Sequence, residues 1–398
     1  MRRGLAAAIA ASCLICVACG GGGGGSSPTP TPTPTPTPSP TPTPTPTPTP
    51  PLPDPSSAPE LKTTFAPNFR VGAAVLIEQI DPATHASDVA LLKKHFSSIT
   101  VANAMKADTL GVAEGQYNFT PADQIVAFAQ ANGIAVRAHT LVWYFTSPAW
   151  FFAGDQSDPA YHQQVRGRLQ KYITDVITHF KGKVYAWDVV NEVASDTAGQ
   201  TYRTNSPWYQ AYSIGGNGAD YIEDAFRFAR AADPDVKLFL NDYSTEWSVK
   251  RTNVLAIVRD LINKGVPIDG VGHQIHTSIT VNSTEVDNAL TAIEQLNLMN
   301  QVTELDMSVY NDPTTNYGDA GPPQAILSQQ ATQYRSLFAV FRKHDASIDA
   351  VTLWGISDAE TWLDNWNTPR KDRPLLFDTS RNPKWAFWAI TDPALTLP

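Results

Sequence analysis

Short apolar runs alternate with longer segments of helical periodicity over most of the chain. Runs of four to eight mostly apolar residues predict buried strands. Apolar positions that recur every three or four residues predict amphipathic helices. The predicted strands are Phe69–Leu76, Phe96–Ala102, Ile134–Leu141, Val184–Val190, Val236–Asn241, Gly270–Ile275, Val302–Leu305 and Val351–Trp354. The predicted helices include Ala122–Ala131, Tyr161–Phe180, Asp220–Ala232, Thr252–Asn263, Ser283–Leu296 and Ile326–Lys343.

This alternation favours a parallel sheet, because parallel strands need a long crossover that a helix can provide. Eight strand candidates within residues 57–398 predict an α/β fold, the closed (β/α)₈ TIM barrel. Such a barrel carries its chemistry at the carboxyl ends of the strands. We therefore expect the functional residues where the predicted strands end.

Residues 1–19 have the pattern of an export signal. Two arginines precede an apolar run from Leu5 to Val17, which is too short to span a bilayer comfortably. The segment ending at Cys19 resembles the cleavage box of bacterial lipoproteins, in which the cysteine becomes lipidated. Cys16 departs from that box, which usually carries Leu at this position. We expect export with Cys19 lipidated at the cell surface; ordinary secretion is the alternative.

Residues 20–56 predict a linker. A glycine run precedes an almost unbroken alternation of Thr and Pro from Pro28 to Pro50. Such a tract buries nothing and favours extended polyproline geometry. At about 3.1 Å per residue the 28 positions from 28 to 55 would reach on the order of 90 Å, so the linker would hold the barrel away from a surface.

Charge and cysteine content exclude several classes of function. The chain has 29 Lys and Arg against 38 Asp and Glu, a net charge of −9. This acidic balance argues against nucleic acid and other polyanions as partners. All 3 cysteines lie in the first 19 residues, so the predicted barrel has no disulfide and no cysteine metal site.

Two glutamates stand out among the residues at the strand ends. Glu192 closes Trp187-Asp-Val-Val-Asn-Glu192, and Glu304 lies in Thr303-Glu-Leu-Asp306. In a barrel these two segments face each other across the mouth. Paired carboxyl groups walled by aromatic rings are suited to hydrolysing a glycosidic bond, with one protonated and the other ionised. Either glutamate alone is as well explained by a helix cap or a salt bridge.

From about Phe69 to Ile390 the chain resembles the family-10 glycoside hydrolases, the endo-β-1,4-xylanases. Each matching segment is weak alone, but together they follow the family order and spacing. The segments are Ile99–Lys106, His139–Trp143, Trp187–Glu192, Asn241–Tyr243, Gln274–His276, Thr303–Asp306, Trp354–Asp358 and Pro374–Asp378.

The resemblance implies a role for each matching residue. Glu192 matches the general acid/base and Glu304 the nucleophile, so the reaction should retain the anomeric configuration. Asn191 matches the amide that binds the sugar 2-hydroxyl. His276 matches the histidine that hydrogen-bonds the nucleophile, with Asp306 behind it. The residues expected to bind the substrate are Asn103, Lys106, His139, Trp143, Tyr243, Gln274, Trp354 and Trp362.

A metal site at His273 and His276 is not expected, because a spacing of three on a strand sends the two side chains to opposite faces. The resemblance implies no cofactor, because side chains handle both proton transfer and covalent capture. We expect a monomer that acts on xylan or a related β-1,4-linked polysaccharide. Contact with a membrane is expected only through the lipid anchor.

The chain departs from the family pattern on the glycone side of the cleft. Ala102 stands where the family usually carries Glu, and Ala107 where Trp is common. Tyr144-Phe-Thr146 replaces a usual His-Ser-Gln, and Ala138 replaces Gly. These changes predict weaker binding of the sugar two units from the cleavage point, or tolerance of a decorated chain there.

Two other functions stay open. An endo-β-1,4-glucanase or a mixed-specificity β-glycanase would use the same glutamate pair. A non-catalytic surface protein that binds polysaccharide would have lost one or both carboxyl groups, yet both are present.

Overall fold

The computed structural model describes residues 51–398. The predicted signal, Cys19 and nearly all of the predicted linker lie outside the described residues. Eight strands form the barrel: β1 (Arg70–Val75), β2 (Ser98–Val101), β5 (Ala135–Ala138), β7 (Ala186–Asn191), β8 (Lys237–Asp242), β9 (Gly270–His273), β11 (Met299–Ser308) and β12 (Ile348–Leu353).

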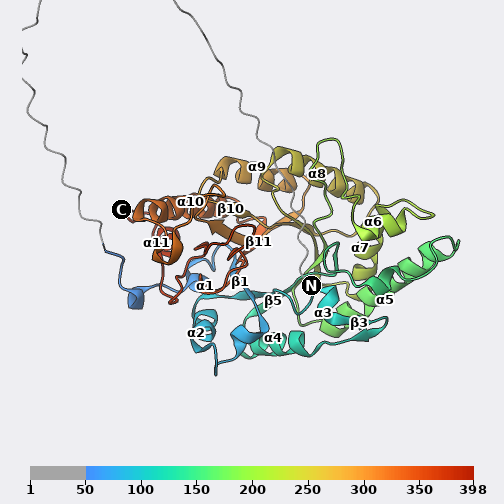
Figure 1. Cartoon of the computed structure of the whole chain (residues 1–398), viewed down its shortest axis with the longest axis horizontal. Helices are drawn as coiled ribbons and strands as arrows, with labels where there is room; N and C mark the ends of the chain where they lie inside the picture. The colour runs from blue at the N-terminus through green and yellow to red at the C-terminus, as the bar shows by residue number, and fades with distance from the viewer. Residues whose placement is uncertain (1–50) are drawn as a thin grey trace, which may run out of the picture. The chain divides into compact units, whose positions relative to one another are not determined.

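These strands pair in parallel with their sequence neighbours around a closed ring. The last strand returns to the first, with Arg70 of β1 opposite Ala350 of β12. Between β9 and β11 the pairing places Met299 opposite Gly270. The predicted (β/α)₈ barrel is confirmed. Figure 1 shows the ring of strands at the centre of the view and the helices outside it.

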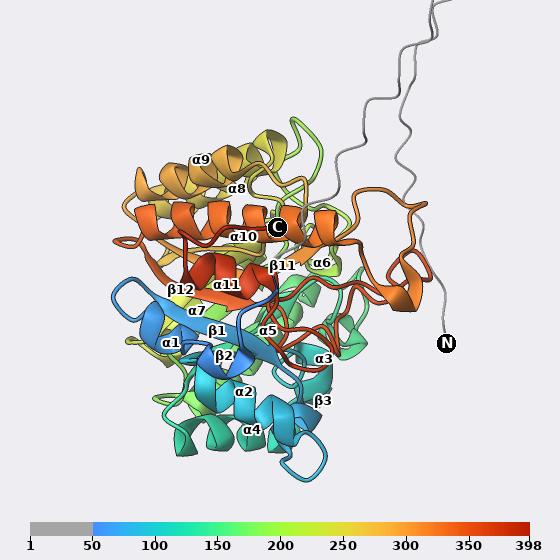
Figure 2. The ribbon, with the colours of Figure 1, turned by 90° about the vertical axis from the view of Figure 1, so that its left-hand side faces the viewer.

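Helices cover the outer face of the barrel. The long ones are α2 (Ala86–His95), α4 (Thr120–Ala131), α5 (Tyr161–Phe180), α7 (Asp220–Ala232), α8 (Ser248–Asn263), α9 (Ser283–Glu294) and α10 (Gln324–Lys343). The short ones are α1 (Leu61–Thr64), α3 (Ala107–Leu110), α6 (Pro207–Tyr212) and α11 (Trp385–Thr391). Figure 2 shows α11 beside α10, where Arg342 donates to the carbonyl of Ile390 at 2.8 Å.

Short segments elaborate the loops. The strand β6 (Val142–Trp143) pairs with β7, and β10 (His276–Ser278) pairs with β11. A small hairpin joins β3 (Gly111–Ala113) to β4 (Gln116–Tyr117). Short 3₁₀ turns follow at Pro55–Ser57, Ile77–Ile80, Ala149–Phe152 and Gly318–Ala320. The turn Ile77–Ile80 follows β1 and is called η2 below.

Two predicted strands are too short. The seventh, predicted over Val302–Leu305, runs from Met299 to Ser308, and the eighth begins at Ile348 instead of Val351. The early part of β11 carries Asn300 and Gln301, which are buried polar residues and so interrupt the apolar pattern. Both amides are hydrogen-bonded, as buried polar groups require.

Glu304, expected near the end of the seventh strand, lies well inside β11, because β10 pairs with β11 and extends the sheet past it. Trp187, Trp385 and Trp388 are all buried in the protein interior. No helix within residues 51–398 is long and apolar enough to cross a membrane.

Candidate active site

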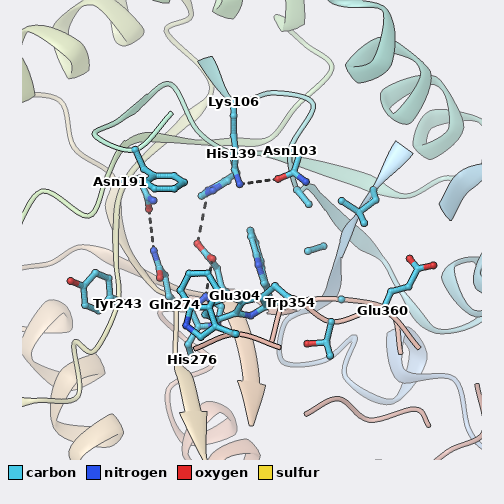
Figure 3. Close-up of a pocket in the computed structure, with 18 of the residues that line it drawn as sticks. Asn103, Lys106, His139, Asn191, Tyr243, Gln274, His276, Glu304, Trp354 and Glu360 are labelled. Carbon is cyan, nitrogen blue, oxygen red and sulfur yellow. Dashed lines mark hydrogen bonds and ion pairs between the residues drawn. The ribbon is translucent and has the colours of Figure 1, made fainter. Parts of the chain in front are cut away.

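A cavity of about 970 Å³ opens where the barrel strands end. Its walls contain every predicted site residue within the described part of the chain except Asp306, which lies behind His276. The lining residues that the sequence predicted are Asn103, Lys106, His139, Trp143, Asn191, Glu192, Tyr243, Gln274, His276, Glu304, Trp354 and Trp362. Figure 3 shows how most of these side chains converge.

Glu192 is the first residue after β7. Its φ of 56° lies in the left-handed region, which residues other than glycine rarely adopt. The Glu192 N–H donates to the carbonyl of Asn241 at 2.8 Å, and this bond helps to hold the turn. Backbone strain of this kind persists where the surrounding structure fixes it, often at functional sites.

Glu304 is buried on the inner face of β11, with 4% of its surface exposed. Asp306 lies two residues further and therefore faces the same side of the strand. The Glu304 N–H donates to the carbonyl of Gln274 on the neighbouring segment at 3.1 Å. Strand pairing thus fixes the position from which this carboxylate enters the cavity.

Side-chain amides connect the two glutamates. The Nδ2 of Asn241 donates to Oε1 of Glu304 at 2.7 Å and to Oδ1 of Asn191 at 2.9 Å. The Nε2 of Gln274 donates to the same Asn191 oxygen at 3.2 Å and to Oε1 of Glu192 at 3.1 Å. Each carboxyl group is therefore held by an amide that also contacts Asn191.

Gly272 makes room for this network. A Cβ at position 272 would lie 2.4 Å from Oδ1 of Asn241, which is far closer than atoms can approach. The same Asn241 oxygen accepts a hydrogen bond from Thr303 at 2.7 Å. A side chain at 272 would displace Asn241, and with it the amide that reaches Glu304.

His276 connects Glu304 to Asp306. Its Nε2 lies 3.1 Å from Oε2 of Glu304, and its Nδ1 lies 2.9 Å from Oδ2 of Asp306. The indole of Trp362 donates to that Asp306 oxygen at 2.7 Å. Burial alone would lower the pKa of His276, but the two carboxylates raise it to about 10, so the ring is protonated near neutral pH.

The two glutamates have pKa values displaced in opposite directions. Burial raises the pKa of Glu192, and the charge of nearby Asp242 raises it further. Burial would also raise the pKa of Glu304, but the hydrogen bond from His276, the nearby ring of His139 and the amide of Asn241 lower it to about 2. One carboxyl group thus favours the protonated form and the other is ionised.

His139 is positioned by a buried ion pair that the sequence did not predict. Its Nδ1 lies 2.9 Å from Oδ2 of Asp188 on β7, and Arg137 on β5 pairs with both oxygens of the same carboxylate. Arg137 and Asp188 are fully buried inside the barrel. The Nδ1 of His139 also lies 4.0 Å from Oε1 of Glu304. The alternation Arg137-Ala-His139 was a visible signal, since both side chains point inward on a strand.

The sequence of the chain also matches a known protein family. Residues 60–393 match the sequence profile described as Glycosyl hydrolase family 10. The chain belongs to glycosyl hydrolase family 10.

Similar proteins span the same part of the chain. A protein named beta-1,4-xylanase from Dictyoglomus thermophilum is 41% identical over 334 residues, which are 83% of this chain and 90% of that protein. The endo-1,4-beta-xylanase C of Paenibacillus barcinonensis is also 41% identical, but the chain spans only 32% of its length. The crystal structure of xylanase B from Clostridium stercorarium F9 has a TM-score of 0.78 at 39% identity and covers 84% of this chain and 100% of that one.

One wall of this family-10 cleft carries Asn103 and Lys106. The ammonium of Lys106 donates to Oδ1 of Asn103 at 2.9 Å and lies 5.0 Å from the ring centre of Trp143. The exposed side chain of Asn103 and the half-buried side chain of Lys106 both face the cavity. Aromatic rings continue around the site, and Trp354 packs edge-on against both His139 and His276.

The opposite wall contains a cluster built around Tyr243. Its hydroxyl donates to Asp196 at 2.6 Å and accepts from Arg203 at 2.7 Å. Arg203 also donates to the carbonyl of Glu192 at 2.7 Å and lies over the ring of Tyr144. Arg203 and Asp196 were not among the predicted site residues, because they lie in a loop without a strand-end signal.

The metal prediction concerns His273 and His276. His273 contacts Thr245 and Asn300. His276 contacts the carboxylates of Glu304 and Asp306, so the two rings lie in different environments. Among residues 51–398 no group of three or more His, Cys, Asp and Glu is arranged to hold a metal ion.

Proposed function

We propose that this family-10 chain is a retaining endo-β-1,4-xylanase that hydrolyses internal bonds of xylan by double displacement. The observation that carries the proposal is that Glu192 and Glu304 both line the cavity and are joined by one amide network, and their pKa values are displaced in opposite directions. The similar proteins named as xylanases support the choice of substrate.

Both steps use the two glutamates. In the first, protonated Glu192 gives its proton to the departing glycosidic oxygen while a carboxylate oxygen of Glu304 bonds to the anomeric carbon. In the second, ionised Glu192 takes a proton from water, and the water oxygen displaces Glu304 from the same carbon. Two inversions give net retention.

Neighbouring side chains suit these steps. The protonated ring of His276 stabilises ionised Glu304 before attack. Asn191 lies between the glutamates, where its amide can bond to the sugar 2-hydroxyl as positive charge develops on the ring. Lys106 is the only Lys or Arg that lines the cavity in the described part of the chain, which suits a neutral polymer better than a polyanion.

Two measurements test the proposal. Proton NMR of the first-formed product should show the retained β-anomer; the α-anomer would contradict Glu304 as nucleophile. Release of reducing ends should be faster from xylan than from carboxymethylcellulose. Faster release from carboxymethylcellulose would favour the endo-β-1,4-glucanase instead, because glucose carries a hydroxymethyl group for which a xylan site needs no room.

We also propose that the distal glycone site is altered. Ala102 lines the cavity with a methyl group, and Phe145 stands at the rim with 73% of its surface exposed. Weaker binding of the second glycone sugar follows if position 102 offers it no hydrogen bond. The substitution Ala102→Glu should then raise kcat/KM on linear xylo-oligosaccharides, and no gain would contradict the proposal.

Export and lipidation at Cys19 remain proposals drawn from the sequence of the first 19 residues. Mass spectrometry of the mature amino terminus tests them directly. A terminal cysteine carrying acyl chains supports a surface anchor, whereas an unmodified terminus created by another cleavage supports secretion.

A further inference from the structure

A carboxylate that the predictions did not include faces the cavity from the loop after β12. Glu360 lines the cavity, and 38% of its side chain is exposed. In Figure 3 it lies at the end of the pocket opposite Tyr243, on the side of Asn103. The other carboxylates treated so far act in catalysis or hold the protein together, so this one needs a separate explanation.

Gln79 of η2 fixes the position of Glu360. The Nε2 of Gln79 donates to Oε2 of Glu360 at 2.8 Å. Its Oε1 accepts from the N–H of Leu76 at 2.9 Å, directly after the end of β1. Gln79 is 4% exposed, so this amide is a rigid support. The carboxylate is therefore placed by the barrel frame and does not sample solvent freely.

Small residues leave space beside this pair. Ala74 and Ala102 line the same cavity, and the N–H of Ala102 donates to the carbonyl of Val75 at 3.1 Å. The end of β2 therefore lies next to the segment that Gln79 holds. The resulting corner has a floor of methyl groups, with Asn103 on one side and the Gln79–Glu360 pair on another.

The chemistry of this corner fits the hydroxyl groups of a neutral sugar. An ionised carboxylate offers about four acceptor sites, and Gln79 occupies one of them. The remaining sites can accept bonds from neighbouring hydroxyls, and hydrogen bonds to a charged group are the stronger kind. Methyl groups on the floor suit the apolar edge of a pyranose ring.

We propose that Glu360, held by Gln79, binds hydroxyl groups of the second glycone sugar, two units from the cleavage point. The inference rests on the proposed xylanase function and adds a substrate-binding residue to it. The alternative is a purely structural latch, because Nε2 of His85 lies 3.4 Å from the other Glu360 oxygen.

Two chromogenic substrates separate these roles. In 4-nitrophenyl β-xyloside one sugar occupies the glycone side, whereas 4-nitrophenyl β-xylobioside adds the second. Glu360→Ala should lower kcat/KM on the xylobioside on the order of tenfold, because a hydrogen bond to a charged group is lost. It should change kcat/KM on the xyloside by less than about twofold. Glu360→Gln, which keeps one acceptor oxygen, should give a smaller loss on the xylobioside.

Matched controls exclude a general effect. Glu60→Gln alters a glutamate of similar exposure outside the cavity and should leave kcat/KM unchanged on both substrates. His85→Ala breaks the latch but leaves the carboxylate on Gln79, so kinetics on the xylobioside should stay unchanged. Equal losses on both substrates, or a loss that His85→Ala reproduces together with a lower Tm, would overturn the inference.

The two proposals fail in different ways. If the unmodified enzyme cleaves both substrates and Glu360→Ala cleaves the xylobioside normally, only the role of Glu360 is wrong. If the unmodified enzyme cleaves neither substrate and releases no reducing ends from xylan, the xylanase function is wrong and the role of Glu360 falls with it.

Discussion

The surroundings of Glu304 and Glu192 differ although the two side chains are chemically identical. Glu304 accepts a hydrogen bond from an imidazole that is itself charged, and another from Asn241. Glu192 accepts hydrogen bonds from the neutral amides of Asn191 and Gln274, and the charge of Asp242 disfavours its ionised form. The surroundings rather than the residue type therefore decide which carboxyl pKa is raised and which is lowered.

Among substitutions at these two glutamates and their partners, Glu304→Ala should cause the largest loss of activity. It removes the group that we propose forms the covalent bond with the sugar, so kcat should fall by at least about 10⁴-fold. The measurement is reducing-end release from xylan, with circular dichroism to verify folding. Glu285→Ala, on the outer helix α9, is the matched control and should keep full activity. Residual activity within tenfold of the unmodified enzyme would exclude Glu304 as nucleophile.

Glu192→Ala should have a smaller effect that depends on the leaving group. Loss of a general acid costs about 10²–10⁴-fold where the departing oxygen needs a proton. On an aryl xylobioside the first step should suffer less, because 4-nitrophenolate leaves without protonation. Pre-steady-state release of nitrophenolate compared with xylan hydrolysis tests this difference. Equal losses on both substrates would contradict the assignment of Glu192 as acid.

His276→Asn should test the lowered pKa of Glu304 through the acid limb of the pH profile. The protonated ring helps to hold the pKa of Glu304 at about 2, so its removal should raise that pKa toward the ordinary carboxyl range. Because the proposed nucleophile Glu304 would react only when ionised, the acid limb of the profile of kcat/KM against pH should move to higher pH. Activity near neutral pH should fall on the order of 10²-fold, as for other lost electrostatic contacts. An unmoved acid limb would contradict this role.

Gln274→Ala should have the smallest effect on activity, and it should move the alkaline limb of the pH profile rather than the acid limb. The amide favours ionised Glu192, so its loss should raise the pKa of Glu192 further. In the proposed mechanism Glu192 must be protonated for the first step, and the alkaline limb of the profile of kcat/KM against pH should therefore move to higher pH. The loss at the optimum should be roughly tenfold or less. Movement of this limb to lower pH would show that Glu192 does not control it.

The sequence predicted elements best where the apolar pattern was regular. The helices Tyr161–Phe180 and Asp220–Ala232 have the predicted bounds, because their apolar repeat runs from end to end. The helix predicted to begin at Thr252 begins at Ser248, since its first turn carries no apolar repeat. In β11 the buried amides Asn300 and Gln301 concealed the start of the strand.

The candidate site was predictable as a set of residues but not as a network. Strand ends identified the glutamates, His276 and Gln274, because a barrel gathers such residues at one face. The opposite pKa shifts follow from which oxygen receives which donor, and no spacing encodes that. The pairs Arg137–Asp188 and Gln79–Glu360 join residues 51 and 281 positions apart, so their partners could not be read locally.

The pairing of β1 with β12 also has a consequence for biogenesis. Because the ring closes only when the final strand docks beside the first, the cleft is among the last features to form as the polypeptide leaves the ribosome. Before then the nascent chain carries exposed, unpaired edges at both ends of its sheet, which invite aggregation. The time at which glycosidase activity first appears during synthesis would therefore report when the barrel closes.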